Sequence, residues 1–503
     1  MSYAAFQTEI ARINDVLCTI NLLGWDQRTM MPAGGIDGRA HQIATLTGIA
    51  RDMATDPQLA ELMDRAEADL PADATLERRA VAQARAEIAT LSRIPSRVIS
   101  EMAELKTRAN AAWVAARAAN DFATYAPVLE RMMGLQREIA AAIGDGGHPY
   151  DAMVGMYEPG MTWDRLQSIY GQLKDALVPL IARAKDGPRP RADILTRRYP
   201  IPAQKDFGLG MARRMGYDME RGRLDDTVHP FEISFTRGDV RITSRFREDW
   251  LPGGLFALWH EAGHGMYEQG IAPEHTRGVF ATDLVNLYAV GGASFGMHES
   301  QSRLWENRVG RSRRFWALHF GALRDTFPDQ LSDVTEDEFW AAVNAVNPSL
   351  IRVEADELTY DMHIILRSEI EAGLVAGDID VADLPGLWAE KMRAYLGVAV
   401  PDDTRGVLQD VHWSHGYLGS FPTYTIGNIV SSQLFAVAQA DAGVAAGLDT
   451  GDYAPLHGWL GENVWRHGRA SSRDETLERV TGGPLDPAAY IADLTAKVEA
   501  LGA

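Results

Sequence analysis

Apolar residues recur every three or four positions along most of the chain, which is the spacing of an amphipathic helix. From residue 1 to about residue 145 the pattern is nearly continuous, as at positions 43, 46 and 49 and again at 128, 129, 132 and 133. The region has no repeat of fixed period. The sequence therefore predicts a helical bundle or cap here rather than a solenoid.

Proline and glycine mark the expected breaks between helices. The segment 25–32, WDQRTMMP, is expected to connect the first two helices, because Pro32 and the glycines after it end any helix that reaches them. Pro95 is expected to break the next pattern, and Pro127 to open another helix. The stretch 185–205 is rich in proline and basic residues and is predicted to be an exposed connection, too short to prove a domain boundary.

Only one pair of segments alternates in polarity as strands do. FEISF at 231–235 and DVRITS at 239–244 are joined through a short turn, so the sequence predicts a hairpin. DVRIT could also be an edge strand with its polar residues outward. Helical patterns dominate again from residue 256 to the end, and the predicted fold class is mainly α with a small β-sheet.

The segment 255–270, LFALWHEAGHGMYEQG, carries the pattern H-E-x-x-H and has apolar flanks typical of a helix. On a helix, His260 and His264 lie one turn apart on one face and can reach one metal ion, with Glu261 placed to handle the proton of a metal-bound water. Gly263 weakens the helix by about 1 kcal/mol relative to alanine, so another backbone is expected to approach there. The alternative is a buried turn that carries two histidines by chance, and we favour the metal site.

A catalytic zinc usually has three protein ligands and keeps one position for water. The best candidate for the third ligand is Glu299, which follows the histidine helix on a segment with a helical pattern. His298 competes with it, because spacing alone cannot choose between adjacent side chains. The alternative for Glu299 is a surface carboxylate paired with Arg303 one turn later.

Composition limits the classes of function. The 503 residues include 49 Lys and Arg against 69 Asp and Glu, a net charge of −20, which argues against partners that are nucleic acids or anionic membranes. The single cysteine excludes an intrachain disulfide and a zinc site built of several thiolates. No run of 18 apolar residues and no apolar signal core is present, so a cytoplasmic location is expected.

Two further segments concentrate polar or aromatic residues. IRVEADELTY at 351–360 surrounds one arginine with acids, and its alternative interpretation is a solvated helix face. QDVHWSHGYLGSFPTY at 409–424 gathers His, Trp and Tyr, and its alternative is an aromatic core patch.

These motifs occur together in one order along nearly the whole chain. In that order the chain carries WDQRTMMP, HPYDAMVGMYEPGMT, HPFEISF, DVRIT, HEAGH, HESQSRLWEN, IRVEAD, GVLQDVHW and FPTYTIGN. Through them it resembles the carboxypeptidase Taq family of zinc metallocarboxypeptidases, in the gluzincin group. HEAGH alone is shared by many metallopeptidases, whereas HESQSRLWEN and GxxQDxHW together are specific to this family.

The resemblance implies a two-lobed helical metallopeptidase with a deep central cleft, similar to neurolysin and angiotensin-converting enzyme. It implies one peptidase domain over 1–503, in which 1–145 forms a helical lid region and 146–503 carries the small sheet and the H-E-x-x-H helix. Members of the family are commonly homodimers, so a homodimer is expected. The segment 277–293 is longer than expected for the family, and its extra residues could reshape the cleft wall or the dimer contact.

The resemblance also implies roles for individual residues. It implies one Zn²⁺ per chain, with Co²⁺ or Mn²⁺ as conceivable substitutes, and Glu261 as the catalytic base. The implied zinc ligands are His260, His264 and Glu299, and the residues implied to line the substrate site are Arg352, His412 and Tyr424.

The chemistry of peptide hydrolysis uses these groups in a consistent way. Zinc lowers the pKa of its water to about 7, Glu261 takes the proton, and His412 or Tyr424 is nominated to stabilise the oxyanion. A carboxypeptidase must also bind the free carboxylate at the peptide's end, for which the planar fork of Arg352 is favoured and Arg241 is the rival. Asp239 is a further substrate-binding candidate, and the edge of the 231–244 hairpin could pair with an extended peptide.

Two other functions remain open from the sequence. One is an endo-acting zinc oligopeptidase with the same core, and the other is a non-catalytic helical scaffold with an inert zinc site. Glu261 speaks against the scaffold, because a structural zinc needs no base.

Overall fold

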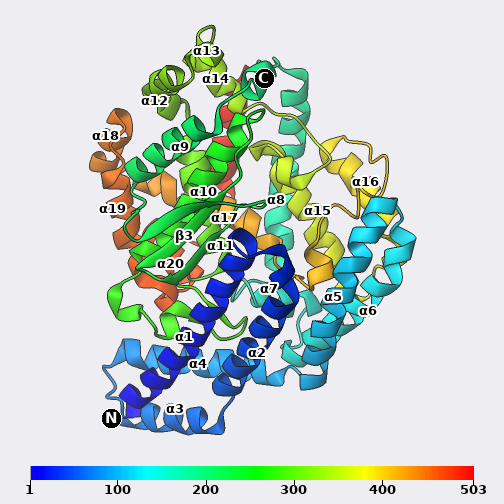
Figure 1. The fold of residues 1–503 in the computed structure, drawn as a ribbon, viewed down its shortest axis with the longest axis vertical. Helices are drawn as coiled ribbons and strands as arrows, with labels where there is room; N and C mark the ends of the chain where they lie inside the picture. Colours follow the sequence, from blue (N-terminus) through cyan, green and yellow to red (C-terminus); the bar gives the residue numbers. More distant parts are fainter. Residues whose placement is uncertain (1, 503) are drawn as a thin grey trace. The chain divides into compact units, whose positions relative to one another are not determined.

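The computed structural model describes residues 2–502, and helices make up most of them (Figure 1). The first helix, α1 (Ser2–Thr29), is longer than expected. Residues 25–29 belong to it rather than to a connection, which corrects the prediction for WDQRTMMP. The buried side chain of Trp25 extends the apolar face of α1 by one more turn. The break occurs where Pro32 and the glycines predict it, before α2 (Ile36–Ala54).

The two proline predictions had different outcomes. Pro95 is the N-cap of α5 (Ser96–Ala119), so the predicted break is confirmed. Pro127 does not open a helix but lies inside α6 (Phe122–Ile143). Asp121, six residues before Pro127, caps that helix by accepting a hydrogen bond from the Thr124 backbone, and this local cap decides where the helix begins.

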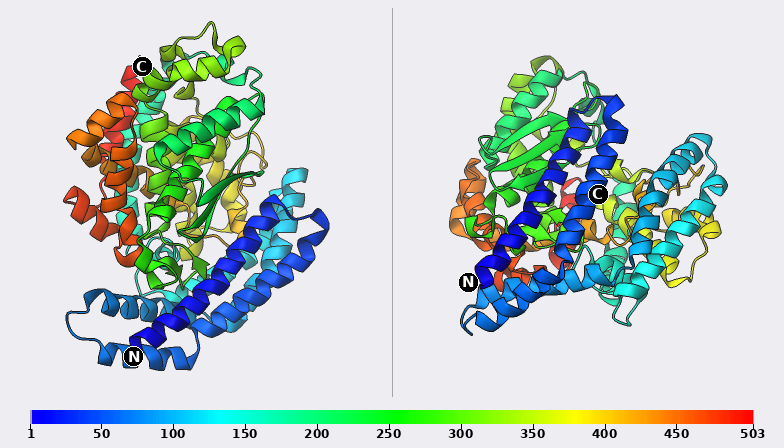
Figure 2. Two further views of the ribbon diagram at one scale, coloured as in Figure 1. Left: turned by 60° about the vertical axis from the view of Figure 1, so that its left-hand side comes forward. Right: turned by 60° about the horizontal axis from the view of Figure 1, so that its bottom comes forward.

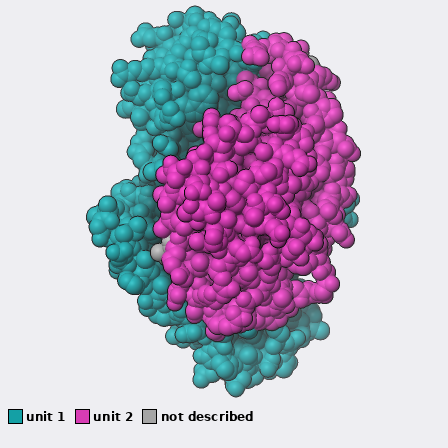
Figure 3. Space-filling model, turned by 90° about the vertical axis from the view of Figure 1, so that its right-hand side faces the viewer, with its two compact units in different colours: residues 1–92, 190–343, 430–485 teal, residues 93–189, 344–429, 486–503 magenta. Residues whose placement is uncertain are grey.

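The chain forms two compact units, each assembled from separate stretches of sequence (Figure 3). Unit 1 comprises 1–92, 190–343 and 430–485, and unit 2 comprises 93–189, 344–429 and 486–503. One boundary falls within the predicted exposed connection, between residues 189 and 190. The assignment of 1–503 as one peptidase domain with a lid at 1–145 stays a prediction.

Unit 1 contains a three-stranded sheet in the order β1-β3-β2. The predicted hairpin is confirmed as β2 (Glu232–Thr236) and β3 (Asp239–Ser244), which pair antiparallel. The sequence missed β1 (Gly222–Asp226), which pairs parallel with β3, because GRLDD has no apolar alternation. The strand DVRIT is therefore central, and its interpretation as an edge strand is wrong.

Two helices, α10 (Leu251–Gly270) and α1, pack against the three-stranded sheet of unit 1. Helix α10 packs against β2 and β3, and α1 packs against β2. Figure 2 shows α1 running alongside α2, with which it is in contact. Asn21 of α1 donates to the backbone oxygens of Ser234 and Ala289, which ties α1 to β2 and to the segment that follows α10.

Unit 2 is built around α15 (Glu357–Ala376), a helix buried along nearly its whole length. It contacts α6, α7 (Pro149–Gly155), α8 (Trp163–Asp186) and α16 (Leu384–Leu396). Gly377 ends α15 in the left-handed conformation that glycine adopts without strain. The helix is enclosed by its neighbours, and the charged side chains that it buries, such as Arg367 and Glu371, have partners inside unit 2.

The remaining elements complete the two units. Among residues 2–502, no single helix is long and apolar enough to cross a membrane, although the bent pair of α17 (Pro422–Ala438) and α18 (Ala442–Thr450) passes that test by length and composition. The other helices are α3 (Pro57–Asp69), α4 (Thr75–Arg93), α9 (Ile201–Met215), α11 (Phe295–Arg303), α12 (Arg313–Thr326), α13 (Pro328–Leu331), α14 (Glu336–Val343), α17 (Pro422–Ala438), α18 (Ala442–Thr450), α19 (Ala454–Asn463), α20 (Arg473–Thr481) and α21 (Ala488–Ala500), and a second small sheet pairs β4 (Thr282–Asp283) with β5 (Tyr288–Ala289).

Candidate metal centre

The predicted histidine helix is confirmed as α10, and it presents both imidazoles on one face. The ring centroids of His260 and His264 are 5.0 Å apart. Burial lowers the pKa of His264 to about 3, so its ring is neutral and a nitrogen lone pair is free to bind a metal. Burial also lowers the pKa of His260, but Glu299 and Glu306 outweigh burial and raise it overall.

Gly263 lies between the two histidines at the point where another helix comes closest. A Cβ atom at this position would meet the backbone oxygen of Gln301 at 2.6 Å and the Cα of Ser302 at 2.7 Å. The predicted approach of another backbone is therefore confirmed. Because position 263 is a glycine and has no Cβ atom, the backbone of α11 can pack directly against α10.

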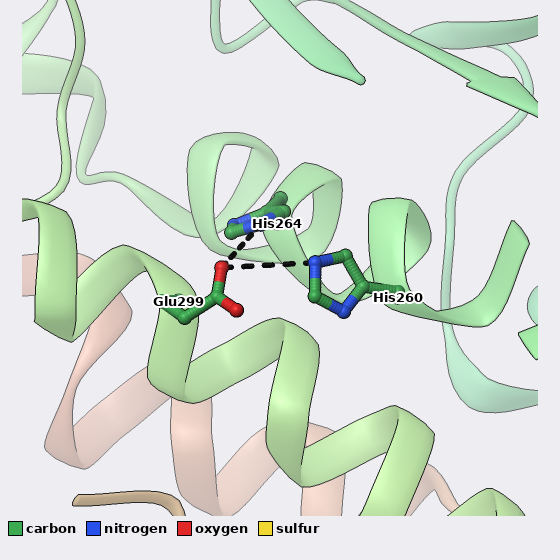
Figure 4. Close-up of side chains that lie close together, drawn as sticks. All are labelled: His260, His264 and Glu299. Carbon is green, nitrogen blue, oxygen red and sulfur yellow. Dashed lines mark ion pairs between the residues drawn. The ribbon is translucent and has the colours of Figure 1, made fainter. Parts of the chain in front are cut away.

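Helix α11 brings Glu299 to the two imidazoles. Ser294 caps this helix by accepting from the Met297 backbone, and Glu299 follows one turn later. One carboxylate oxygen of Glu299, Oε2, lies 3.6 Å from Nε2 of His260 and 3.4 Å from Nε2 of His264. Figure 4 shows the carboxylate directed toward both rings.

This set of donors fits a zinc ion. Ligand atoms at the usual zinc distances in a tetrahedral arrangement are about 3.3–3.4 Å from one another. The two nitrogen–oxygen separations at Glu299 are close to that value. Each of the three residues offers one ligand atom, and these atoms all lie within 4.8 Å of one another. Such a group of His, Cys, Asp or Glu side chains could hold a metal ion, and among the described residues it is the group found.

Glu299 is also paired with Arg303, but not at the surface. Its other oxygen, Oε1, accepts a hydrogen bond of 2.6 Å from Nε of Arg303, and the carboxylate is buried. Burial raises the pKa of Glu299, but Arg303 and the two histidines outweigh burial and hold it well below its usual range. The arginine thus keeps the carboxylate ionised and leaves Oε2 directed toward the imidazoles.

Glu261 is a buried carboxylate next to this group. Burial raises its pKa to about 7, while the charge of His260 and a hydrogen bond from the backbone of Glu232 on β2 act in the opposite direction. A general base is most effective when its pKa is near the working pH. Glu261 therefore has the environment that a proton-transfer group needs.

The outer nitrogens of both imidazoles have partners in the protein. Nδ1 of His260 lies 2.9 Å from Oε2 of Glu306, and Nδ1 of His264 lies 2.5 Å from Nδ1 of His298. The side chain of His298 thus contacts the outer nitrogen of His264, whereas the side chain of Glu299 faces the inner nitrogens of both imidazoles. Sequence analysis missed Glu306, which lies in a π-helical turn at Leu304–Gly310, after α11 has ended.

Arg241 and Asp239 lie on β3 and bind each other. The guanidinium donates to both oxygens of Asp239 at 2.8 Å. It also stacks on the rings of Trp25 and Phe235, at 4.3 and 4.8 Å from their centroids. These contacts hold α1 against the sheet and engage Nε, one N–H of Nη2 and the flat face of Arg241.

In unit 2, Arg352 is buried and paired with Asp410. Its Nε and Nη2 both donate at 3.1 Å to one oxygen of Asp410, and Nη1 donates to the hydroxyl of Tyr360. The acids of IRVEADE do not hold it. Asp356 caps α15 instead, Glu354 is exposed, and Glu357 pairs with Lys497.

A second arginine shares the same carboxylate. Arg367 is fully buried on α15 and donates to the other oxygen of Asp410 at 2.6 Å. Two guanidinium groups thus face one carboxylate, which leaves an excess of one positive charge in a buried site. Sequence analysis missed both Arg367 and Asp410, because these partners are 43 residues apart in the chain.

His412 and Tyr424 lie near Arg352 within unit 2. The His412 ring packs on Phe421, and its buried Nδ1 has no hydrogen-bond partner in the described part of the chain. Burial and the charge of Arg352 lower its pKa to about 4, so the ring is neutral. Tyr424 packs at the edge of an apolar cluster with Tyr360, Ile364 and Phe421, and Arg352 lies 5.5 Å from its ring centroid. The alternative of an aromatic core patch is therefore partly correct.

Two imidazoles and a buried carboxylate that converge on one point, beside a second carboxylate with a raised pKa, define a metal-dependent hydrolase. Comparison with known proteins gives the family. The chain belongs to the Carboxypeptidase Taq (M32) metallopeptidase family, whose profile matches residues 5–498. The protein is a metallocarboxypeptidase, and the resemblance seen in the sequence is confirmed.

Relatives match over nearly their full length. Thermostable carboxypeptidase 1 of Thermus thermophilus is 41% identical over 521 residues, covering 99% of each chain. Carboxypeptidase 1 of Bacillus subtilis is 36% identical and covers 95% of this chain and 94% of its own. The crystal structure of an M32 carboxypeptidase from Deinococcus radiodurans has a TM-score of 0.95 at 40% identity, with 100% of both chains covered. A carboxypeptidase structure from Pyrococcus furiosus has a TM-score of 0.93 at 30% identity, with 99% of both covered.

Proposed function

We propose that the protein is a zinc-dependent carboxypeptidase that binds one ion per chain through His260, His264 and Glu299. The observation that carries the proposal is the convergence of two Nε2 atoms on one oxygen of Glu299, at 3.6 and 3.4 Å. Two imidazoles and a carboxylate suit zinc, and Co²⁺ or Mn²⁺ would be substitutes.

Glu261 is the general base in this proposal. When bound, zinc supplies Lewis acidity, which lowers the pKa of a water molecule and polarises the scissile carbonyl. Glu261 accepts the proton of the attacking water and then donates it to the amine that leaves when the peptide bond breaks. Burial raises the pKa of Glu261 to about 7, which suits a group that must both accept and donate this proton.

Arg352 is proposed to bind the carboxylate at the end of the peptide. Burial of that carboxylate without a cation would be costly. The site around Arg352 has two guanidinium groups against the single carboxylate of Asp410, so it can accept one more negative charge. Three of the N–H groups of Arg352 are engaged, and within the described part of the chain the other two have no hydrogen-bond partner.

His412 and Tyr424 are proposed to donate to the oxyanion that develops as water attacks. His412 is neutral, so one of its ring nitrogens carries a proton, and the tyrosine hydroxyl is also a donor. A substrate role for Arg241 or Asp239 remains a prediction, and their contacts with each other and with Trp25 favour a role in packing.

Other expectations also stay predictions: the two-lobed arrangement with a deep cleft and the homodimer, which the resemblance implies, and the cytoplasmic location, which the composition indicates. Pairing of an extended peptide with the edge of the hairpin also stays a prediction, and part of the β2 backbone is already engaged. The backbone oxygens of Ser234 and Phe235 already accept from Asn21 and Cys18.

Metal analysis tests the proposed ligands. We expect about one zinc per wild-type chain and a strong loss of zinc in His264→Ala and in Glu299→Ala. Glu478→Ala, which removes an exposed carboxylate from α20 in the same unit, is the matched control and should keep the metal. Full zinc content in both ligand variants would contradict the proposal.

A further inference from the structure

His264 differs from His260 in the group that holds its outer nitrogen. Nδ1 of His260 meets a carboxylate oxygen of Glu306 directly, at 2.9 Å. Nδ1 of His264 meets another imidazole, that of His298, at 2.5 Å. Nε2 of His298 then lies 3.0 Å from Oε1 of Glu268, so a chain of three side chains runs from His264 to a buried carboxylate.

Glu268 is surrounded by donors. The backbone N–H groups of Gly291 and Gly292 donate to it at 2.9 and 3.1 Å, and the hydroxyl of Ser234 donates at 3.1 Å. A side chain that accepts from three such groups acts as a carboxylate and not as a donor. The nitrogen of His298 that faces it must therefore carry a proton.

In the neutral form of His298 this places the remaining protons along His264, His298 and Glu268. The single ring proton is on Nε2, so Nδ1 of His298 has no proton and can only accept. The bond at 2.5 Å then requires the proton on Nδ1 of His264, which leaves Nε2 of His264 with a free lone pair. That Nε2 is the atom directed toward Glu299.

Packing keeps the ring of His298 in this position. Its ring is inclined by 29° to that of His264, with the centroids 4.6 Å apart, and lies 5.5 Å from the ring of Tyr267. A Cβ at Gly292 would meet Cδ2 of His298 at 2.5 Å, so the glycine pair allows the backbone to reach both His298 and Glu268. A second carboxyl group, that of Glu232, lies 3.9 Å from Nε2 of His298, farther than Glu268.

We propose that His298, oriented by Glu268, is a positioning residue that fixes the tautomer and ring orientation of the metal ligand His264. The proposal rests on the proposed function, because it takes His264 as a ligand. Partners of this kind commonly change metal affinity by about 10–100-fold. The predicted competition between His298 and Glu299 for the metal is then resolved by giving the two adjacent residues different tasks.

Zinc affinity of the full-length protein, measured by competition with a chelator, tests the proposal. His298→Phe keeps a ring of similar size but cannot accept from His264, and we expect zinc binding about 10–100-fold weaker than wild type. His298→Asn keeps an acceptor near the position of Nδ1, and we expect it to recover much of this loss. Wild-type zinc affinity in His298→Phe, or an equal loss in the Phe and Asn variants, would overturn the proposal.

The thermal midpoint of the metal-free variants separates positioning from a general role in folding. A purely structural role would lower this midpoint in both variants without separating their zinc affinities. The proposed function fails separately, if the wild type takes up no zinc or if Glu299→Ala leaves its zinc content unchanged. If those two results hold as expected and His298→Phe still binds zinc like the wild type, only the role of His298 is wrong.

Discussion

Gly263→Ala is the substitution that most directly tests how α11 presents Glu299 to α10. The new Cβ would lie 2.6 Å from the Gln301 oxygen, whereas ordinary contacts begin at 3.4 Å, so the backbone of α11 would have to retreat by about 0.8 Å. Overpacking of this kind costs about 1–3 kcal/mol, against a gain of about 1 kcal/mol from alanine's better helix propensity. Because the contact is with backbone, we expect a net loss of stability of about 1–2 kcal/mol.

The same shift should weaken metal binding, because Glu299 is on the displaced helix and ligands must keep their places to within about 0.5 Å. Urea unfolding and zinc titration measure the two effects. Gly321→Ala is the matched control. It is exposed within α12 of the same unit, nothing lies within 4 Å of its added Cβ, and it should stabilise the protein by about 0.5–1 kcal/mol. If Gly263→Ala behaved like this control and bound zinc normally, the packing argument would be refuted.

Further predictions concern catalysis. Glu261→Gln should keep its zinc, by elemental analysis, and lose turnover by a factor of about 100 or more; unchanged turnover would remove Glu261 from the mechanism. Arg352→Ala should lose about 2–5 kcal/mol of kcat/KM on free-acid peptides and change little on amidated ones. Arg241→Ala should lower stability and should not change activity on free-acid peptides more than on amidated ones. A selective loss on free-acid peptides in Arg241→Ala, and not in Arg352→Ala, would make Arg241 the carboxylate-binding residue.

The elements that the sequence predicts well are those with a strong local signal. Helix α10 has an uninterrupted apolar face, and the hairpin of β2 and β3 alternates in polarity, so both could be read directly. Strand β1 could not be predicted, because its own residues carry no strand pattern and it becomes a strand only by pairing with β3. Pro127 misled for a related reason, since the cap at Asp121 had already started the helix.

The candidate site shows the same division. The spacing of His260 and His264 predicts that they share one face of the helix, and Gly263 predicts the close approach of a second backbone. The task of His298 could not be read, because its neighbour Glu299 points to the histidine pair while His298 reaches a glutamate 30 residues away in the chain. Asp410 was missed because its partnership with Arg352 spans 58 residues. Contacts of this kind depend on tertiary packing, which periodicity does not report.

The most direct test of the account is the mass of the products that the purified protein releases from matched peptides with free and amidated C-termini, with and without a chelator. The account predicts stepwise loss of single residues from the free-acid peptides and little or no cleavage of the amidated ones. The chelator should abolish this activity, and added zinc should restore it. Internal fragments, equal cleavage of both peptide sets, or full activity in the chelator would contradict the account, and the first two results would favour an endo-acting peptidase.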